Sequence, residues 1–380
     1  MLEEKKPHKV VKEKKHEPLF HITKREQVTV SKAICIRAIA ILAALVFSGI
    51  VTVLLTGDNP ISVYVTMFQG AFGNTNRIWV TAQNLAMLLC VSLAVTPAFK
   101  MRFWNIGAEG QVLIGGLATA MCMFYIGDSV PTWLLIVVMI IASIVAGAVW
   151  GIIPAIFKAQ WETNETLFTL MMNYVAIQLV EFFLKIADKS GSNTVGPDIL
   201  KHGWLPMLFG QKYLLNILIV LVITIAMYIY LKYSKQGYEI SVVGESENTA
   251  RYIGINVKKV IIRTMAISGA ICGFTGLLLI GGTSHSIDAN IVDGRGFTAI
   301  MVSWLAKFNP LMMILTAFLL VFLDRGADEV STKFGLNSSF ADIISGIILF
   351  FIIGCEFFIQ YKINFNEKAK LFGNKRREDT

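Results

Sequence analysis

Long apolar runs alternate with short polar segments along most of the chain. A bilayer core about 30 Å thick is crossed by about 20 apolar helical residues, so such runs predict membrane spans. The predicted spans are 33–55, 78–99, 111–127, 132–157, 167–187, 213–231, 260–281, 297–306, 310–323 and 341–360. The pattern therefore predicts an all-α integral membrane protein with about ten transmembrane helices, of which 297–306 and 310–323 are the shortest.

Composition excludes the soluble classes of protein. Of the 380 residues, 55% are hydrophobic and 16% are charged, whereas a soluble domain has about 25% charged residues. The net charge of +8 lies mostly in two tails, because residues 1–32 carry nine basic and five acidic residues and residues 361–380 carry six and three. We expect a transmembrane domain over 33–360 between two basic cytoplasmic tails. A nucleic-acid partner is not expected, since the basic residues are not interleaved with aromatic ones on a folded face. Membrane lipid is expected to be a partner of the chain.

The distribution of Lys and Arg predicts the orientation. With the N-terminus inside, the predicted cytoplasmic segments hold 26 of the 34 basic residues. Such an excess is typical of cytoplasmic loops, so both termini are expected in the cytoplasm.

Two glycine-rich segments interrupt the spans. They are residues 100–110 (KMRFWNIGAEG) and 281–297 (GGTSHSIDANIVDGRGF), and each precedes a helix rich in small residues. Under the predicted topology the first faces the cytoplasm and the second faces outward, which favours an inverted repeat of 78–187 and 260–360. Paired interrupted segments of this kind mark transport sites. The alternative is that both are ordinary loops that end helices.

One long polar segment, residues 232–263, lies between predicted spans. Ser246 precedes a predicted short helix that ends at Gly254, and a further helix begins near Val257. The segment is too polar to cross a bilayer and is not Ser/Gly-rich like a linker. Two short helices across a membrane face predict a docking surface.

Four runs in this order resemble a known family: FWNIGAEGQVLIGGLATA (103–120), NETLFTLMMNYVA (164–176), GYEISVVGESENTARYIGINV (237–257) and GRGFTAIMVSWL (294–305). They resemble the permease family of ABC importers for branched-chain amino acids, ribose and nucleosides, and NIGAEGQ is most similar to the nucleoside and simple-sugar permeases. The resemblance spans about residues 78–360.

The resemblance implies that the chain is one of two permease subunits, homologous or identical. It implies a cytoplasmic ATPase that binds the 232–263 segment, and a binding protein or lipoprotein that delivers solute outside. No phosphate-binding G-x-x-x-x-G-K-[ST] occurs in the chain. We therefore expect no cofactor and no metal in this chain, with ATP bound by the partner, and a location in a prokaryotic plasma membrane.

Within the docking segment, the residues expected to form the ATPase coupling loop are Gly244, Glu245, Ser246, Arg251, Gly254 and Asn256. Members of the family often have Pro where this chain has Glu247. Glutamate also suits the first turn of a helix, so the coupling geometry is expected to survive.

Polar and aromatic residues at the breaks are candidates for the solute path: Asn105, Glu109, Gln111, Asn173, Phe103, Trp104 and Phe297. Glu109 is either a site residue or a helix cap, because an unpaired carboxylate at membrane depth is costly. Asn173 either joins two helices or binds solute. The aromatic residues either stack on a base or anchor the span ends at the membrane interface.

These residues favour a polar, uncharged solute. Amides and aromatic rings suit a nucleoside, and a pentose or hexose would use similar groups, so a simple sugar is the first alternative. A branched-chain amino acid is a further alternative. An ion-coupled secondary transporter is an alternative of another class, and the absence of H-E-x-x-H and G-x-S-x-G motifs leaves an intramembrane enzyme without support.

Overall fold

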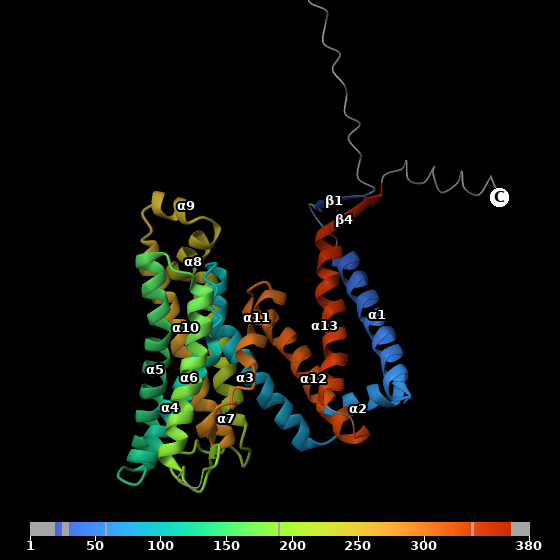
Figure 1. The fold of residues 1–380 in the computed structure, drawn as a ribbon. Helices are drawn as coiled ribbons and strands as arrows, with labels where there is room; N and C mark the ends of the chain where they lie inside the picture. The colour runs from blue at the N-terminus through green and yellow to red at the C-terminus, as the bar shows by residue number, and fades with distance from the viewer. Residues whose placement is uncertain (1–19, 25–29, 58, 189–190, 336–337, 366–380) are drawn as a thin grey trace, which may run out of the picture. The chain divides into compact units, whose positions relative to one another are not determined.

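The computed structural model describes residues 20–24, 30–57, 59–188, 191–335 and 338–365, and these are mostly helical (Figure 1). The elements in chain order are β1 (Phe20–Lys24), α1 (Val30–Thr56), α2 (Pro60–Phe72), α3 (Thr75–Lys100), α4 (Ala108–Ile126), α5 (Thr132–Trp161), α6 (Glu165–Ala187), β2 (Thr194–Val195), α7 (Leu214–Tyr233), α8 (Lys235–Glu245), α9 (Glu247–Tyr252), α10 (Val257–Leu279), the π-helical turn η1 (Ile280–Ser284), β3 (Ile287–Asp288), α11 (Arg295–Leu305), α12 (Pro310–Phe334), α13 (Ser338–Gln360) and β4 (Tyr361–Phe365).

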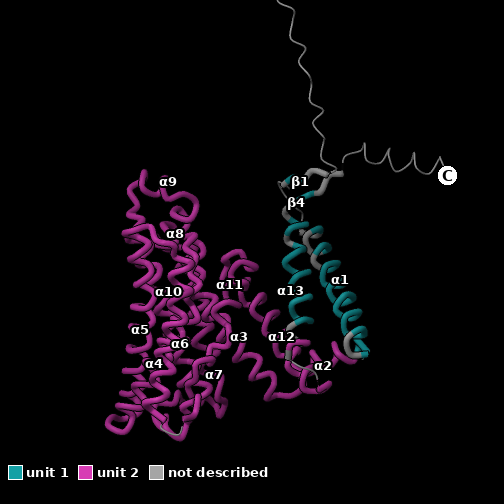
Figure 2. The backbone as a smooth tube through the Cα atoms, in the orientation of Figure 1, with its two compact units in different colours: residues 1–61, 343–380 teal, residues 62–342 magenta. Residues whose placement is uncertain are grey.

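The chain forms two compact units, residues 1–61 with 343–380 and residues 62–342 (Figure 2). In the first unit, β1 pairs antiparallel with β4, so that Ile22 lies opposite Ile363. The Phe47 ring of α1 lies 5.9 Å from the Phe351 ring of α13. Two strands that lie more than 300 residues apart in the chain therefore pair within one unit. The sequence pattern did not predict this strand pair.

The second unit is a helical bundle in which glycines let α4, α5 and α10 approach closely. A Cβ atom added at Gly147 of α5 would lie 2.2 Å from the Gly269 carbonyl oxygen of α10, and one at Gly115 of α4 would lie 2.2 Å from Gly273 Cα. Small residues at such crossings maximise van der Waals contact between helices in a membrane. These three helices therefore form a tightly packed core.

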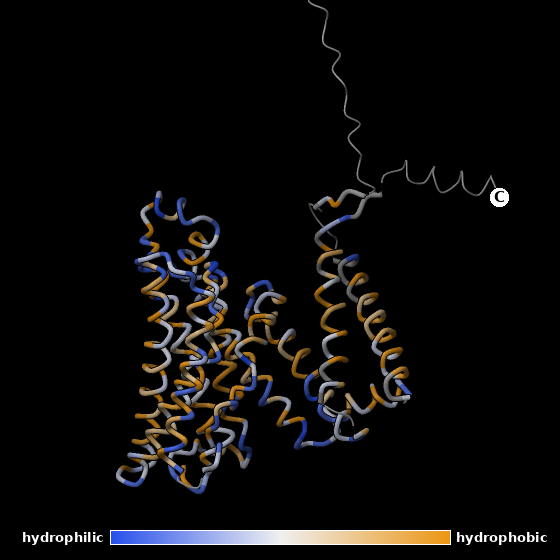
Figure 3. Tube along the Cα trace, viewed as in Figure 1, coloured by the Kyte–Doolittle hydropathy of each residue, from blue (hydrophilic) through white to orange (hydrophobic). Residues whose placement is uncertain are grey.

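Seven of the described helices are long and apolar enough to cross a membrane: α3, α4, α5, α6, α7, α12, and α10 together with η1. In Figure 3, most residues of these helices are coloured as hydrophobic, whereas the α8 and α9 segments contain more hydrophilic residues. Shorter apolar stretches occur at Ala38–Leu54 and Ile343–Ile359. The fold is thus mostly helical, with several helices that could cross a membrane, and the count of ten spans and the inverted repeat remain predictions.

The predicted short spans differ in the structure. The expected span 297–306 is α11, with 11 residues, which is too short to cross a bilayer alone. The expected span 310–323 is longer, because Asn309 caps α12 and the helix continues for 25 residues to Phe334. The polar side chains after Leu323 shortened the apparent apolar run.

The polar segment between α7 and α10 forms α8 and α9, which lie together at one end of the bundle (Figure 1). The Ser246 Oγ accepts a hydrogen bond from the Thr249 N–H at 3.2 Å, so Ser246 is the N-cap of α9 as its position predicted. Gly254 has a φ of +85°, which favours glycine, and Val257 begins α10. The sequence pattern did not predict α8.

Candidate functional site

The first glycine-rich break, residues 100–110, is held by the side chain of Asn173 on α6. The Asn173 Nδ2 donates to the Ile106 carbonyl at 3.0 Å, and its Oδ1 accepts from the Gly110 N–H at 2.9 Å. Thr169, one turn earlier, accepts from the Ile106 N–H at 3.1 Å. Both ends of the amide therefore bond the backbone of the break, so Asn173 joins α6 to this segment.

The carboxylate of Glu109 connects the two breaks. Its Oε1 accepts from the Gly294 N–H at 2.9 Å, and its Oε2 accepts from the Gly296 N–H at 2.7 Å. These backbone groups lie at the start of α11, where amide N–H groups lack helical partners and the helix dipole favours negative charge. Glu109 is therefore the capping group of α11, from a position 185 residues earlier in the chain.

Gly296 is necessary for this contact. A Cβ atom at position 296 would lie 2.5 Å from the Glu109 backbone nitrogen and 2.7 Å from its Oε2. Gly294 has a φ of +68°, which a residue with a side chain rarely adopts. The glycines of the second break thus permit its backbone to reach the first break.

A buried cluster of neutral polar groups surrounds Asn105 and Gln111, which lie close to Glu109 in the chain. The Asn105 Oδ1 accepts from the Gly107 N–H at 3.0 Å and from the Gln111 Nε2 at 3.3 Å, and its Nδ2 lies 3.5 Å from the Ser268 Oγ of α10. Asn105, Gln111 and Ser268 are fully or almost fully buried. The cluster links the break to α10, and Ser268 was not among the residues that the sequence pattern singled out.

The four aromatic side chains at the breaks differ in exposure. Phe103 is buried in the apolar cluster with Ile240 and Val243 of α8. Trp104 and Trp304 are half exposed and stack on each other, with ring centroids 5.7 Å apart and an angle of 28° between the rings. Phe297 is exposed to a similar extent. The structure therefore brings Trp104 of the first break against Trp304 of α11, the helix that follows the second break.

Arg295, at the start of α11, makes mostly local contacts. Its guanidinium lies 3.8 Å from Asp293, donates to the Val292 carbonyl at 3.0 Å and lies 3.3 Å from the Asn84 side chain. Its charge is therefore already engaged by groups of the second break.

A further polar cluster lies where η1 meets α3 and α7. Gln83 donates to the Thr283 Oγ1 at 2.6 Å, and Asn216 donates to the same oxygen and to the Leu278 carbonyl at 3.2 Å. A π-helical turn often marks a functional position. The sequence pattern missed this cluster; its signal was the occurrence of amide side chains within apolar runs.

The predicted coupling loop is arranged around α9. Arg251 lies 3.4 Å from Glu247 on the same exposed turn, and the Asn256 Oδ1 accepts from the Lys259 N–H at 3.1 Å, which caps α10. Glu245 is exposed at the end of α8. Gly244 is buried, and a Cβ atom there would lie 2.1 Å from the Lys100 carbonyl oxygen at the end of α3. Gly244 therefore packs α8 against α3.

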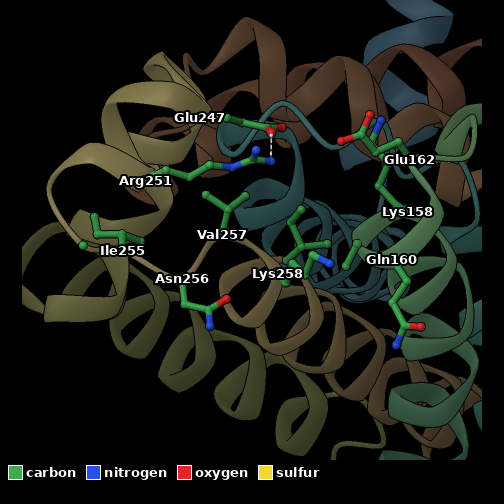
Figure 4. Close-up of a pocket in the computed structure, with 12 residues that line it drawn as sticks. Lys158, Gln160, Glu162, Glu247, Arg251, Ile255, Asn256, Val257 and Lys258 are labelled. Carbon is green, nitrogen blue, oxygen red and sulfur yellow. Dashed lines mark hydrogen bonds and ion pairs between the residues drawn. The ribbon is translucent and has the colours of Figure 1, made fainter.

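A cavity of about 790 Å³ opens beside α9 (Figure 4). One wall is the end of α5 and the turn after it, and the other is α9 with the start of α10. The lining residues are Lys158, Ala159, Gln160, Glu162, Glu247, Arg251, Gly254, Ile255, Asn256, Val257, Lys258 and Ile261.

Comparison with known proteins agrees with this architecture. Residues 78–353 match the family described as the permease component of the branched-chain amino acid transport system. The matched segment contains both breaks and the α8–α9 segment. The chain therefore belongs to this family of ABC transporter permeases.

Individual relatives cover most of the chain. It is 28% identical over 339 residues to the glucose ABC transporter permease protein TsgB13 of Haloferax volcanii, covering 86% of this chain and 88% of the relative. It is 29% identical over 314 residues to the guanosine ABC transporter permease protein NupP of Bacillus subtilis, covering 80% and 89%. It is 27% identical over 326 residues to the nucleoside ABC transporter permease protein NupB of Lactococcus lactis, covering 82% and 89%.

A solved structure titled as an inward-facing conformation of a putative metal-chelate type ABC transporter superposes with a TM-score of 0.46. The two chains are 14% identical, with 86% of this chain and 99% of the other covered.

Proposed function

We propose that this chain is a permease subunit of an ATP-driven importer and that its solute is a nucleoside. It acts in the prokaryotic plasma membrane with both termini and α8–α9 on the cytoplasmic side. Its partners are an ATPase on that side, a second permease subunit and an extracytoplasmic binding protein or lipoprotein. ATP binds to the ATPase, and the permease itself catalyses no reaction.

The observation that carries the solute class is the neutral character of the polar groups where the breaks meet. Asn105, Gln111 and Ser268 are uncharged, and the Glu109 carboxylate is occupied by two backbone N–H groups. Arg295 is engaged by the second break. A neutral, hydroxylated solute needs hydrogen bonds and an apolar or stacking face, without a fixed ionic partner.

The stacked pair of Trp104 and Trp304 favours a solute with a flat ring, because aromatic faces bind nucleobases by stacking. Relatives named for guanosine and for nucleosides support the same choice. A simple sugar is the second candidate, since a relative is named for glucose and hydroxyl groups would use the same amides.

Transport would proceed by alternating access. Closure of the ATPase subunits on ATP moves α9 and α10, and the helices around the breaks rock to open the path on one side at a time. Asn173 ties the first break to α6, and Glu109 ties it to α11, so the two breaks would move as connected parts.

Competition uptake tests the proposal. Cells expressing this chain with its neighbouring transporter subunits receive labelled guanosine, and unlabelled guanosine, uridine, ribose or leucine is added in excess. Inhibition by the nucleosides alone is the expected result. Inhibition by ribose would assign a sugar permease instead, and uptake that persists after ATP depletion would contradict an ATP-driven importer.

A further inference from the structure

The polar cluster around η1 lies at the end of α10 that is far from α9. Gln83 of α3 and Asn216 of α7 both donate to the Thr283 Oγ1, at 2.6 and 3.2 Å. Asn216 and Thr283 each donate to the Leu278 carbonyl oxygen at 3.2 Å. The helix α10 begins shortly after α9 and has 23 residues, and a helix of that length spans about 35 Å. The cluster therefore lies toward the membrane surface opposite α9.

These contacts leave two acceptor oxygens of the cluster without a donor. Within the described part of the chain, neither the Gln83 Oε1 nor the Asn216 Oδ1 accepts a hydrogen bond, although both atoms are buried. The two side chains are only 2% and 1% exposed. Unpaired acceptors are costly in a protein interior and are rare in native structures. The cluster thus has surplus acceptors that suit a ligand with hydrogen-bond donors.

The chemistry of the cluster favours a neutral ligand. Amide and hydroxyl groups carry no charge, so the cluster has no ionic partner for a charged ligand. Within the described residues, no three His, Cys, Asp or Glu side chains lie together in an arrangement that could hold a metal ion. Two hydroxyl groups of a sugar ring would donate two hydrogen bonds and bring no charge into the bundle.

The backbone of η1 is shaped to receive the Asn216 amide. A Cβ atom at Gly282 would lie 2.5 Å from both the Oδ1 and the Nδ2 of Asn216. Only a glycine therefore lets the amide approach the turn this closely. A π-helical turn inside an α-helix is frequent at functional sites, so the arrangement is consistent with a binding role.

An aromatic pair lies beside the same turn. The Leu205 N–H donates to the Gly281 carbonyl oxygen at 2.8 Å, which holds the segment before α7 against η1. In this segment, the Trp204 ring stacks on His285 at 4.2 Å, with an angle of 15° between the rings. Trp204 is 39% exposed. An exposed aromatic ring near hydrogen-bonding groups suits a solute that has both a flat base and a hydroxylated sugar.

From this geometry we infer that the η1 cluster is an outer subsite for the solute, in which Gln83 and Asn216 accept hydrogen bonds from two hydroxyl groups of the sugar. The inference rests on the proposed function, and the subsite is separate from the buried amides at the two breaks. Both oxygens are closed off in this structure. The solute therefore reaches them in an outward-open conformation, in which residues 203–205 and α7 move away from η1.

Uptake of a guanosine analogue tests the inference. Proteoliposomes that hold the complete transporter receive guanosine or its dideoxy analogue, which lacks both secondary hydroxyl groups of the ribose, and kcat/KM is measured for each. We expect the unaltered protein to prefer guanosine about tenfold, and Gln83→Met and Asn216→Leu each to lower this preference below about threefold.

Thr264→Val is the matched control. The Thr264 hydroxyl is also buried in α10, without a partner in the described part of the chain, but it lies nearer α9. This variant should keep the preference of the unaltered protein. Because the preference is a ratio measured on one preparation, a smaller folded fraction does not change it.

The other outcomes separate the possibilities. If Gln83→Met and Asn216→Leu keep the preference and only their unfolding midpoints fall, the cluster does no more than stabilise η1 and the inference is wrong. Equal uptake of guanosine and its analogue by the unaltered protein would also overturn it. If the unaltered transporter takes up neither compound, the proposed function itself fails.

Discussion

The Glu109 carboxylate accepts a 2.7 Å hydrogen bond from the backbone N–H of Gly296, which lies 187 residues later in the chain. A second bond to Gly294 makes this carboxylate the cap of α11. A charge-assisted bond of this kind contributes about 1.5–3 kcal/mol. The relationship explains why an acid and glycines occur together at the two breaks.

Replacement of Gly296 by alanine should disrupt this contact. The new Cβ would lie 2.5 Å from the Glu109 nitrogen, so α11 must shift and the cap is lost. We expect a lower thermal unfolding midpoint in detergent and at least tenfold slower uptake. Gly196→Ala is the control, because nothing lies within 4 Å of that position. Equal behaviour of the two variants would show that the cap is dispensable.

Loss of the Asn173 amide should release the first break from α6. Asn173→Leu has a similar volume but leaves the Ile106 carbonyl and the Gly110 N–H without these partners, which costs about 1–3 kcal/mol for each buried group. We expect the unfolding midpoint to fall, and Asn173→Asp to retain only the bond from Gly110. An unchanged midpoint in Asn173→Leu would mean that water replaces the amide.

Arg251→Ala should uncouple ATP hydrolysis from uptake without unfolding the membrane part. Arg251 is exposed on α9, and within the described part of the chain it forms an ion pair with Glu247 alone. The measurement is the ratio of solute transported to ATP hydrolysed in proteoliposomes. Normal coupling would exclude α9 as the coupling element. Gly244→Pro should also uncouple hydrolysis from uptake, but unlike Arg251→Ala it should destabilise the protein. The reason is that a Cβ atom at this position would collide with the Lys100 carbonyl oxygen.

Trp304→Leu should weaken the binding of a nucleoside. The substitution removes one ring of the stacked pair, so the apparent KM for guanosine should rise by about fivefold to tenfold, which corresponds to the lower part of the about 1–3 kcal/mol for a stacked base. The unfolding midpoint should not change. Trp133→Leu, at an exposed tryptophan of α5, is the control. A lower unfolding midpoint with an unchanged apparent KM would indicate a structural role for the pair.

His285, directly after η1, should make this segment sensitive to acid. Its ring stacks on Trp204 at 4.2 Å, and burial, followed by the charge of Lys212, lowers the pKa of His285 below its usual value of about 6.5. The unfolded chain therefore binds this proton more readily than the folded one. Stability from the neutral ring is full above about pH 6.5 and declines as the pH falls toward the lower folded pKa. The unfolding midpoint of His285→Phe should depend less on pH between 7 and 5 than that of the unaltered protein.

Apolar runs and helix-capping residues in the sequence predicted the helices well where hydrophobicity and helix capping decide the local structure. Apolar runs located the long helices, and Ser246 and Gly254 marked the ends of α9. The same signals failed where tertiary packing decides. The helix α8 has few apolar residues, yet it forms because Phe103, Ile240 and Val243 pack in one buried cluster. The π-turn η1 has no local signature of comparable strength.

The residue types near the breaks were also evident from the sequence, since buried amides and a carboxylate in a membrane protein require partners. Which partners they have could not be predicted. Asn173 could have bound a solute or a neighbouring helix, and only the structure places Ile106 and Gly110 against both of its polar atoms. Glu109 could equally have capped its own helix.

By itself, the sequence determined the class of this protein, the position of most of its long apolar helices and the family of permeases to which it belongs. These follow from local properties, because hydrophobicity, helix capping and backbone freedom act over a few residues. Only the tertiary structure decided that the Glu109 carboxylate caps α11 and that the α5–α6 turn faces α9 across a cavity. Such contacts join residues far apart in the chain, and they depend on how closely the glycines of α4, α5 and α10 allow the helices to pack.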